Sequence, residues 1–267
     1  MANRPSQEER GRRFAALHEE GCFLIPNPWD GGSARVLEAL GFEALATSSS
    51  AFAFTLGRDD GEVTLDELVE HVSALVTASD LPVSVDLENG FGAAPEHAAR
   101  AIEAVAAVGA VGGSIEDWDP EAGLYDIGAA AERIAAAAAV VAELPFPFML
   151  TARAENHIRG NPDLDDTIAR LRAYEEAGAD VLFAPGLASA EEIATVAGAV
   201  GLPLNVLARP TMTVPEIAGA GARRISVGGS LAWATIEAMA AVARPMLADG
   251  DLSGLRPGGQ VAEWLGG

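Results

Sequence analysis

The sequence predicts an α/β fold, a (β/α)₈ barrel, from two observations. Short apolar stretches alternate eight times with longer segments of helical periodicity. Glycine stands just before four of the expected strands, at a position typical of a helix C-cap: Gly41, Gly109, Gly178 and Gly221. Near-continuous apolar strands that alternate with helices indicate a parallel sheet, and eight such units close into a barrel. A doubly wound open sheet is the alternative, but it usually has about five to seven strands.

The eight strands are expected where apolar runs are short and end in polar or glycine-containing loops. They are residues 22–25, 43–47, 82–86, 111–115, 146–151, 181–183, 204–206 and 224–227. Helices are expected after them at residues 33–40, 64–79, 95–108, 129–143, 164–177, from 189, from 213, and at 231–247. The pairs Thr64 and Glu67, and Thr213 and Glu216, have capping-box spacing, which supports two of these helix starts.

A chain of 267 residues suits one large domain of this type. We therefore expect a single domain over residues 1–267, with an N-terminal helix in 1–21, the barrel in 22–247 and a tail in 248–267. Ser6 and Glu9 form a capping-box pattern for the first helix. The tail is rich in glycine and ends in an amphipathic segment, which could dock on the barrel or on a neighbouring subunit.

Charge and composition exclude several classes of partner. The chain has 39 acidic against 17 basic residues, a net charge of −22. This argues against nucleic acid and anionic membranes, which both require a basic surface. The first residues are polar and charged, unlike a signal peptide, and the apolar run 134–142 is too short to span a bilayer. We expect a cytoplasmic protein.

Two absences narrow the chemistry. The sequence contains no lysine, which excludes a Schiff-base aldolase and a pyridoxal-phosphate enzyme. Carbonyl chemistry must then use a metal, an arginine or backbone amides. The single cysteine, Cys22, excludes an internal disulfide and a multi-cysteine metal site.

Four acids fall at the ends of two adjacent predicted strands. Asp86 and Glu88 follow the third strand, and Glu116 and Asp117 end the fourth. In such a barrel the carboxyl ends of the strands form the active face. Like charges gathered there need a counter-ion, and Mg²⁺ fits because it takes oxygen ligands and few protein carboxylates. No histidine or cysteine cluster suggests zinc. A solvated loop is the alternative interpretation.

Other polar residues at the same face suggest a carboxylate site. Arg153 could bind a substrate carboxylate, or could instead pair with Glu116 or Asp117. Ser48, Ser49 and Ser50 could hold a second carboxylate, or form a plain turn. The loop 55–63, which carries Asp60, could act as a lid or be an ordinary surface loop.

Taken together, four motifs resemble the isocitrate lyase / phosphoenolpyruvate mutase superfamily over about residues 23–247. They are the Asp86-x-Glu88 pair, residues 115–117, residues 152–155, and the opening segment 27–35. The resemblance implies a (β/α)₈ barrel, commonly tetrameric, that acts on α-oxo acids. It also implies C–C or P–C bond chemistry by way of an enolate, with Mg²⁺ as cofactor.

The resemblance also implies roles for individual residues. Asp86 and Glu116 would be magnesium ligands, directly or through water, with Glu88 in support. Ser48, Ser49 and Ser50 match the segment that holds the substrate carboxylate, and Arg153 matches the arginine that binds substrate oxygens. Asp60 matches the aspartate of the gating loop, and Asn205 a strand-seven asparagine of the lyases. Trp29, in the opening motif, is a further candidate substrate-binding residue.

The chain departs from the family pattern in two places. Residues 118–126 lack the Lys-Cys-Gly-His loop of isocitrate and methylisocitrate lyases, and also the Lys and Asn usual in mutases. Ala184 to Gly186 stand where those lyases carry a glutamate. A smaller, oxaloacetate-like or malate-like acid is therefore the better candidate.

These observations predict a magnesium-dependent lyase of a small α-oxo or 2-hydroxy carboxylic acid, acting by C–C cleavage or decarboxylation as a homo-oligomer. Three alternatives stay open. One is phosphonomutase-type P–C chemistry. The second is a phosphate-binding barrel enzyme that uses Gly228 and Gly229. The third is a barrel that has lost its activity.

Overall fold

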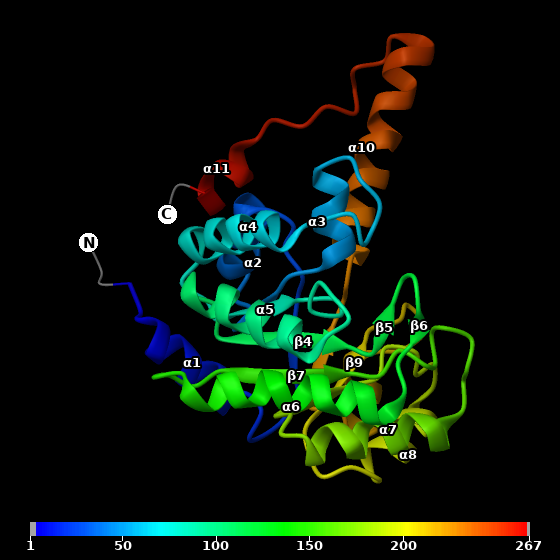
Figure 1. The fold of residues 1–267 in the computed structure, drawn as a ribbon. Coiled ribbons are helices and arrows are strands. Elements are labelled where there is room, and N and C mark those ends of the chain that lie inside the picture. Colours follow the sequence, from blue (N-terminus) through cyan, green and yellow to red (C-terminus); the bar gives the residue numbers. More distant parts are fainter. Residues whose placement is uncertain (1–3, 266–267) are drawn as a thin grey trace.

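The computed structural model describes residues 4–265 and confirms the predicted barrel (Figure 1). Eight parallel strands form one sheet in the order β1-β10-β9-β8-β7-β4-β3-β2. Their bounds are β1 Phe23–Ile25, β2 Leu45–Ala46, β3 Val83–Asp86, β4 Gly112–Glu116, β7 Met149–Arg153, β8 Val181–Phe183, β9 Leu204–Leu207 and β10 Arg224–Ser226. Residues 1–3 and 266–267, the outer ends of the predicted N-terminal segment and tail, lie outside the described residues.

The barrel is closed between β1 and β2 by loop contacts. The Ala46 N–H donates to the Pro26 carbonyl at 3.1 Å. The side chain of Asn27 then ties three strand ends together, because its Nδ2 donates to the Thr47 carbonyl at 2.9 Å and its Oδ1 accepts from two amides after β10. These bonds satisfy backbone groups that an open edge would leave unpaired.

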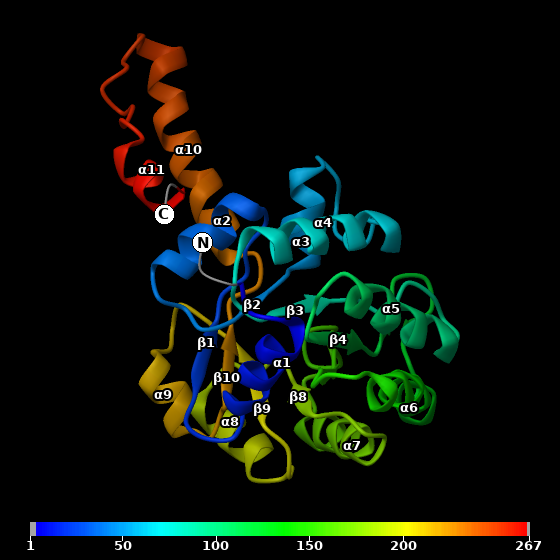
Figure 2. The same ribbon diagram turned by 90° about the vertical axis from the view of Figure 1, so that its left-hand side faces the viewer.

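Helices cover the outside of the barrel (Figure 2). Their bounds are α1 Gln7–Ala16, α2 Gly31–Ala39, α3 Ser49–Thr55, α4 Leu65–Ala78, α5 Pro95–Ala107, α6 Ile127–Glu143, α7 Leu164–Glu176, α8 Ala190–Ala197, α9 Val214–Gly219, α10 Ser230–Asp249 and α11 Gly259–Leu265. The capping boxes predicted at Ser6, Thr64 and Thr213 are all present. Each side chain accepts from the third helical amide, as the sequence spacing predicts.

Helix α1 packs across the amino-terminal end of the barrel. Its Phe14 is fully buried in a cluster with Phe23 and Val111. Gly112 permits this packing, because a Cβ there would lie 2.7 Å from the Phe14 ring. The amino-terminal end is therefore filled with side chains, and the carboxyl ends of the strands are left for the site.

Two elements were not expected from the sequence. The serine segment after β2 starts the short helix α3, with Ser48 as its N-cap. The segment 118–126, expected as a loop, contains a hairpin of β5 Trp118–Asp119 and β6 Gly123–Leu124. Strands of two residues and a two-turn helix are too short to show a period in the sequence.

The C-terminal part leaves the barrel and returns. Helix α10 extends away from the rest of the molecule, and the following segment comes back so that α11 packs on α2 (Figures 1 and 2). The amphipathic tail thus docks on its own barrel, one of the two possibilities left open by the sequence. Within residues 4–265 no helix combines the length and apolar character needed to cross a bilayer.

Candidate active site

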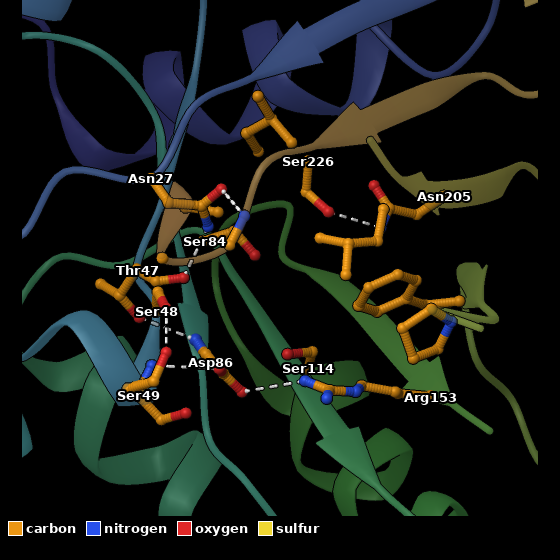
Figure 3. A pocket seen from close by; sticks show the side chains of 18 of the residues that line it. Asn27, Thr47, Ser48, Ser49, Ser84, Asp86, Ser114, Arg153, Asn205 and Ser226 are labelled. Atoms are coloured by element: carbon orange, nitrogen blue, oxygen red, sulfur yellow. Dashed lines mark hydrogen bonds and ion pairs between the residues drawn. The ribbon is translucent and has the colours of Figure 1, made fainter. Parts of the chain in front are cut away.

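A cavity of about 200 Å³ opens among the carboxyl ends of the strands. Figure 3 shows its polar side chains converging from β1, β2, β3, β4, β7, β9 and β10. Seven of the predicted site residues line it, while Glu88 and Glu116 do not: the seven are Ser48, Ser49, Ser50, Asp60, Asp86, Arg153 and Asn205. The barrel thus brings together residues that are up to 157 positions apart, from Ser48 to Asn205.

Asp86 ends β3 and is held in place by backbone amides. Its Oδ2 accepts from the Ser49 N–H at 3.1 Å, and its Oδ1 accepts from the Glu88 N–H at 3.4 Å. The Asp86 N–H in turn donates to the Thr47 hydroxyl at 2.8 Å. The carboxylate therefore has a fixed position but keeps lone pairs that face the cavity.

Arg153, at the end of β7, is the cation of the site. Its Nη1 lies 3.4 Å from Glu116 Oε2 and 3.9 Å from Asp86 Oδ1, and its Nε donates to Glu155. Burial alone would lower the pKa of Arg153, but these three acids raise it instead, so the guanidinium stays charged. The ion pair with Glu116 that the sequence offered as an alternative to substrate binding is present.

The remaining acids are not fully compensated by this arginine. Burial, Asp86 and Asp60 raise the pKa of Glu88 to about 8, against a partial lowering by Arg153. Burial also raises the pKa of Glu116 well above its ordinary value, with Arg153 opposing and Glu155 adding to the shift. Burial is the main cause of both shifts, and nearby acids add to it, so a cation beside these carboxyls would favour their charged forms.

Glu88 lies in a strained turn. Its φ is +49°, in the left-handed region that non-glycine residues seldom adopt. The following loop is fixed from below by Arg133 of α6, which is 1% exposed and donates to the carbonyls of Asn89, Ala93 and Ala94. Strain maintained by surrounding contacts is typical of functional sites.

The loop 55–63 places Asp60 at the mouth of the cavity. Partial desolvation raises the pKa of the Asp60 carboxyl, a hydrogen bond with Ser49 lowers it, and Asp86 raises it further. A Cβ on Gly61 would lie 3.9 Å from Glu88 Oε2, so the loop passes directly over the acids. Asp60 thus reaches the site in this conformation, while the gating motion stays a prediction.

The serines and Asn205 differ in how they meet the cavity. The hydroxyls of Ser48 and Ser50 lie 3.1 Å apart, and Ser49 contributes its amide to Asp86. Asn205 is 1% exposed and donates from Nδ2 to Ser226 Oγ at 3.0 Å. Trp29, half-buried before α2, is not among the residues that line the cavity.

Sequence reasoning placed Glu155 at the end of its strand without assigning it a role, did not single out Arg159, and misplaced Asp117. Glu155 is fully buried and bridges Arg153 and Arg159, and Arg159 stacks over Trp118 at 4.5 Å. Asp117 does not join the acid cluster: it accepts from Tyr174 at 2.5 Å, Arg170 at 3.0 Å and the Glu155 N–H at 2.7 Å. The alternation of side chains along a strand could have separated Glu116 from Asp117.

The acids near the cavity supply oxygen ligands of the kind that Mg²⁺ takes. Among residues 4–265, no three His, Cys, Asp or Glu side chains form a ready-made metal cluster. Mg²⁺ needs only one or two carboxylates and keeps several waters, so Asp86 and Glu116 suffice in kind. Burial raises the pKa of Glu88 and of Glu116, and a neighbouring cation would offset that effect. The residues present therefore fit this ion.

Comparison with known proteins gives the family. The family model described as phosphoenolpyruvate phosphomutase matches residues 14–247. A 2-methylisocitrate lyase of Halalkalibacterium halodurans is 34% identical, over 74% of this chain and 67% of its own length. An oxaloacetate decarboxylase of Bradyrhizobium sp. is 32% identical, over 79% of this chain and 74% of its own length.

Comparison with solved structures supports the same family. A Burkholderia cenocepacia J2315 protein provisionally named a lyase/mutase is 48% identical with a TM-score of 0.94, over 98% of this chain and 97% of that one. A phosphonopyruvate hydrolase solved with oxalate and Mg²⁺ has a TM-score of 0.87 over 98% and 95% of the two chains; at 22% identity it shows the fold alone. The chain belongs to the phosphoenolpyruvate phosphomutase family, within the isocitrate lyase / phosphoenolpyruvate mutase superfamily of barrel enzymes.

Proposed function

We propose that this chain is a magnesium-dependent carbon–carbon lyase of a small α-oxo or 2-hydroxy carboxylic acid. One observation carries the proposal: Arg153 lies 3.9 Å from Asp86 and 3.4 Å from Glu116 at the edge of a cavity that Arg153 and Asp86 line. A cation held by the two acids, beside an arginine able to bind a carboxylate, suits an anionic substrate. The kinship with lyases and a decarboxylase that act on such acids supports this reading.

Each residue has a proposed role in cleaving a bond β to a carbonyl. Mg²⁺, held by Asp86 and Glu116 with Glu88 in support, would stabilise negative charge as it develops on the substrate oxygens. Arg153 binds the substrate carboxylate, and the Ser48 and Ser50 hydroxyls donate to its second oxygen. Asn205 contacts the far side of the substrate. Trp29 stays a weaker candidate, because it does not line the cavity.

Asp60 is the proposed base at the mouth of the cavity. Its raised pKa makes it a better proton acceptor than an ordinary aspartate, and it lies on the loop that would exclude water when closed. Cleavage of a 2-hydroxy acid needs such a base for the hydroxyl proton. Decarboxylation of a β-oxo acid does not, so an Asp60 variant would distinguish the two reactions.

Phosphate-barrel chemistry is the less favoured candidate. A phosphate cradle after β10 would need free backbone amides. The N–H groups of Val227 and Gly228 donate to Asn27 Oδ1 at 3.0 and 2.9 Å, and the Ser230 N–H donates to the Val227 carbonyl. Phosphonomutase-type P–C chemistry uses the same cation site, so phosphonopyruvate belongs in the substrate screen.

Helix α10 supports self-association as part of this proposal. It has 20 residues, and Ala232 is its one buried side chain. Several apolar side chains of α10 are exposed: Leu231, Trp233, Met239 and Leu247. An isolated helix with an uncovered apolar surface gains stability when a second copy covers it. We propose a homo-oligomer, a tetramer by family resemblance, and expect Met239→Glu to reduce the mass measured by light scattering.

The test is thermal unfolding with Mg²⁺ and oxalate, which has the planar shape and charge of pyruvate enolate. A ligand at one hundred times its Kd stabilises the folded state by about 2.7 kcal/mol. We expect a shift that requires both components, followed by pyruvate release from an oxaloacetate or substituted malate in a substrate screen. No shift with the pair would contradict the proposal and favour a barrel without activity.

A further inference from the structure

Arg224, the first residue of β10, is a buried cation without an acidic partner. Its side chain lies inside the barrel, 4% exposed, and lines the floor of the cavity. Its three hydrogen-bond partners among the described residues are neutral: Asn205, Thr151 and His18. Burial accordingly lowers the pKa of Arg224 to about 9. Burying a charge without an opposite charge beside it costs free energy, so we expect Arg224 to have a role beyond packing.

The bond to Asn205 fixes the direction of that amide. A guanidinium can only donate, so Arg224 Nε, at 2.9 Å, must face the amide oxygen Oδ1. The amide nitrogen Nδ2 then points the opposite way and donates one proton to Ser226 Oγ at 3.0 Å (Figure 3). The two ends of Asn205 are thereby assigned by chemistry. A flipped amide would place two N–H protons against the arginine.

The contact between Arg224 and His18 also has a defined donor and acceptor. Its Nη1 lies 3.3 Å from His18 Nε2, which must therefore accept. The His18 Nδ1 carries the proton and donates to the Phe14 carbonyl at 2.8 Å. Burial, and then the charge of Arg224, lower the pKa of His18 to about 3, so the ring stays neutral. His18 cannot release Arg224 by becoming protonated near neutral pH.

We propose that Arg224 is a positioning residue that locks Asn205 as a hydrogen-bond donor to the substrate. The second Nδ2 proton of Asn205 is the one left for a ligand in the cavity that Asn205 lines. An anionic carboxylic acid presents only acceptors, and a donor of fixed direction recognises it without reorganisation. This inference rests on the proposed function, since it takes the ligand to be such an acid.

Asn205→Asp is the sharpest test, because it keeps the shape of the side chain. It replaces the donor with an oxygen and gives Arg224 a carboxylate. We expect the ligand-free variant to unfold at the same temperature as the wild type or higher, while its Kd for oxalate with Mg²⁺, by calorimetry, rises at least tenfold. Weaker binding without a loss of stability separates this role from a merely structural one.

Arg224 variants test the lock itself. Arg224→Met releases the amide and should raise the oxalate Kd at least tenfold, whereas Arg224→Lys can still donate to Oδ1 and should restore most of the affinity. Arg10→Met is the matched control, because Arg10 is a buried arginine on α1 outside the cavity. Its oxalate Kd should equal that of the wild type.

Two results would overturn the inference. One is Asn205→Asp that is less stable than the wild type, since Arg224 would then not gain from a carboxylate. The other is wild-type oxalate affinity in Asn205→Asp or Arg224→Met. If the wild type itself binds no oxalate, the proposed function fails, and the ligand-free stability of Asn205→Asp still tests whether Arg224 requires an acceptor at this position. If Arg224→Met does not fold, Asn205→Asp and Arg224→Lys decide.

Discussion

Glu155 anchors Arg153 from behind the cavity. The two residues lie two positions apart at the end of β7, and the Arg153 Nε donates to the fully buried Glu155 carboxylate. This contact leaves the Nη groups of the guanidinium facing Glu116 and Asp86. The direction of the proposed substrate-binding group is therefore set by a residue that does not line the cavity.

Glu155→Gln should weaken ligand binding, although residue 155 does not line the cavity and would act only through Arg153. The neutral amide cannot form the ion pairs with Arg153 and Arg159, so the guanidinium of Arg153 would no longer be held in its direction. Loss of a charged hydrogen bond of this kind costs about 1.5–3 kcal/mol. We expect an oxalate Kd at least about tenfold higher, measured by calorimetry with Mg²⁺. Glu38→Gln, a change on α2 away from the cavity, should leave the Kd unchanged; an unaltered Kd in Glu155→Gln would show that Arg153 is positioned by other contacts.

Metal dependence should reside in the two acids that flank Arg153. Asp86→Asn and Glu116→Gln each remove a proposed ligand, so the Mg²⁺-dependent shift in Tm with oxalate should disappear in both. The ligand-dependent stabilisation lost should be about 2.7 kcal/mol when the free ligand is present at one hundred times its wild-type Kd. Glu96→Gln, on the first turn of α5, is the control that should keep the full shift. A retained shift in both site variants would place the ion elsewhere.

Glu88 should make the metal-free protein less stable at alkaline pH. Its pKa is about 8 in the folded protein against an ordinary 4.5, so its stabilising contribution is complete below about pH 4.5 and is lost as the pH rises through 8. Glu88→Gln removes this loss. We expect the variant to be more stable than the wild type by roughly 1–3 kcal/mol at pH 9 in EDTA, by urea unfolding. If the difference in stability between the wild type and Glu88→Gln were the same at pH 5 and at pH 9, the raised pKa of Glu88 would be refuted.

His18 should act in the opposite direction at acid pH. Its pKa is lowered from 6.5 to about 3, so its contribution is present above about pH 6.5 and is lost as the pH falls toward 3. His18→Gln can still accept from Arg224 but does not titrate. The wild type should lose about 1.4 kcal/mol relative to the variant for each pH unit well below 6.5. Parallel acid-unfolding curves for the two proteins would contradict this expectation.

The sequence by itself determined the repeat of strands and helices, several helix starts and many of the polar residues that line the cavity at the carboxyl ends of the strands. These features are local: Thr64 caps its helix through a residue three positions on, and Asp86 follows its own strand. The carboxyl ends of the strands meet at one face in any parallel barrel, so the polar residues that follow each strand could be predicted to lie together from the sequence. The short helix α3 and the β5–β6 hairpin escaped, because elements so short carry no period.

Only the tertiary structure decided how the charges are paired. Asp117 and Glu116 are adjacent in sequence, yet one turns to Tyr174 and Arg170 behind the barrel and the other to Arg153. Arg224 meets His18 across 206 residues, and α11 could rest on α2 or elsewhere until the chain was folded. Such contacts depend on the direction of each side chain within the closed barrel, which no spacing along the chain encodes.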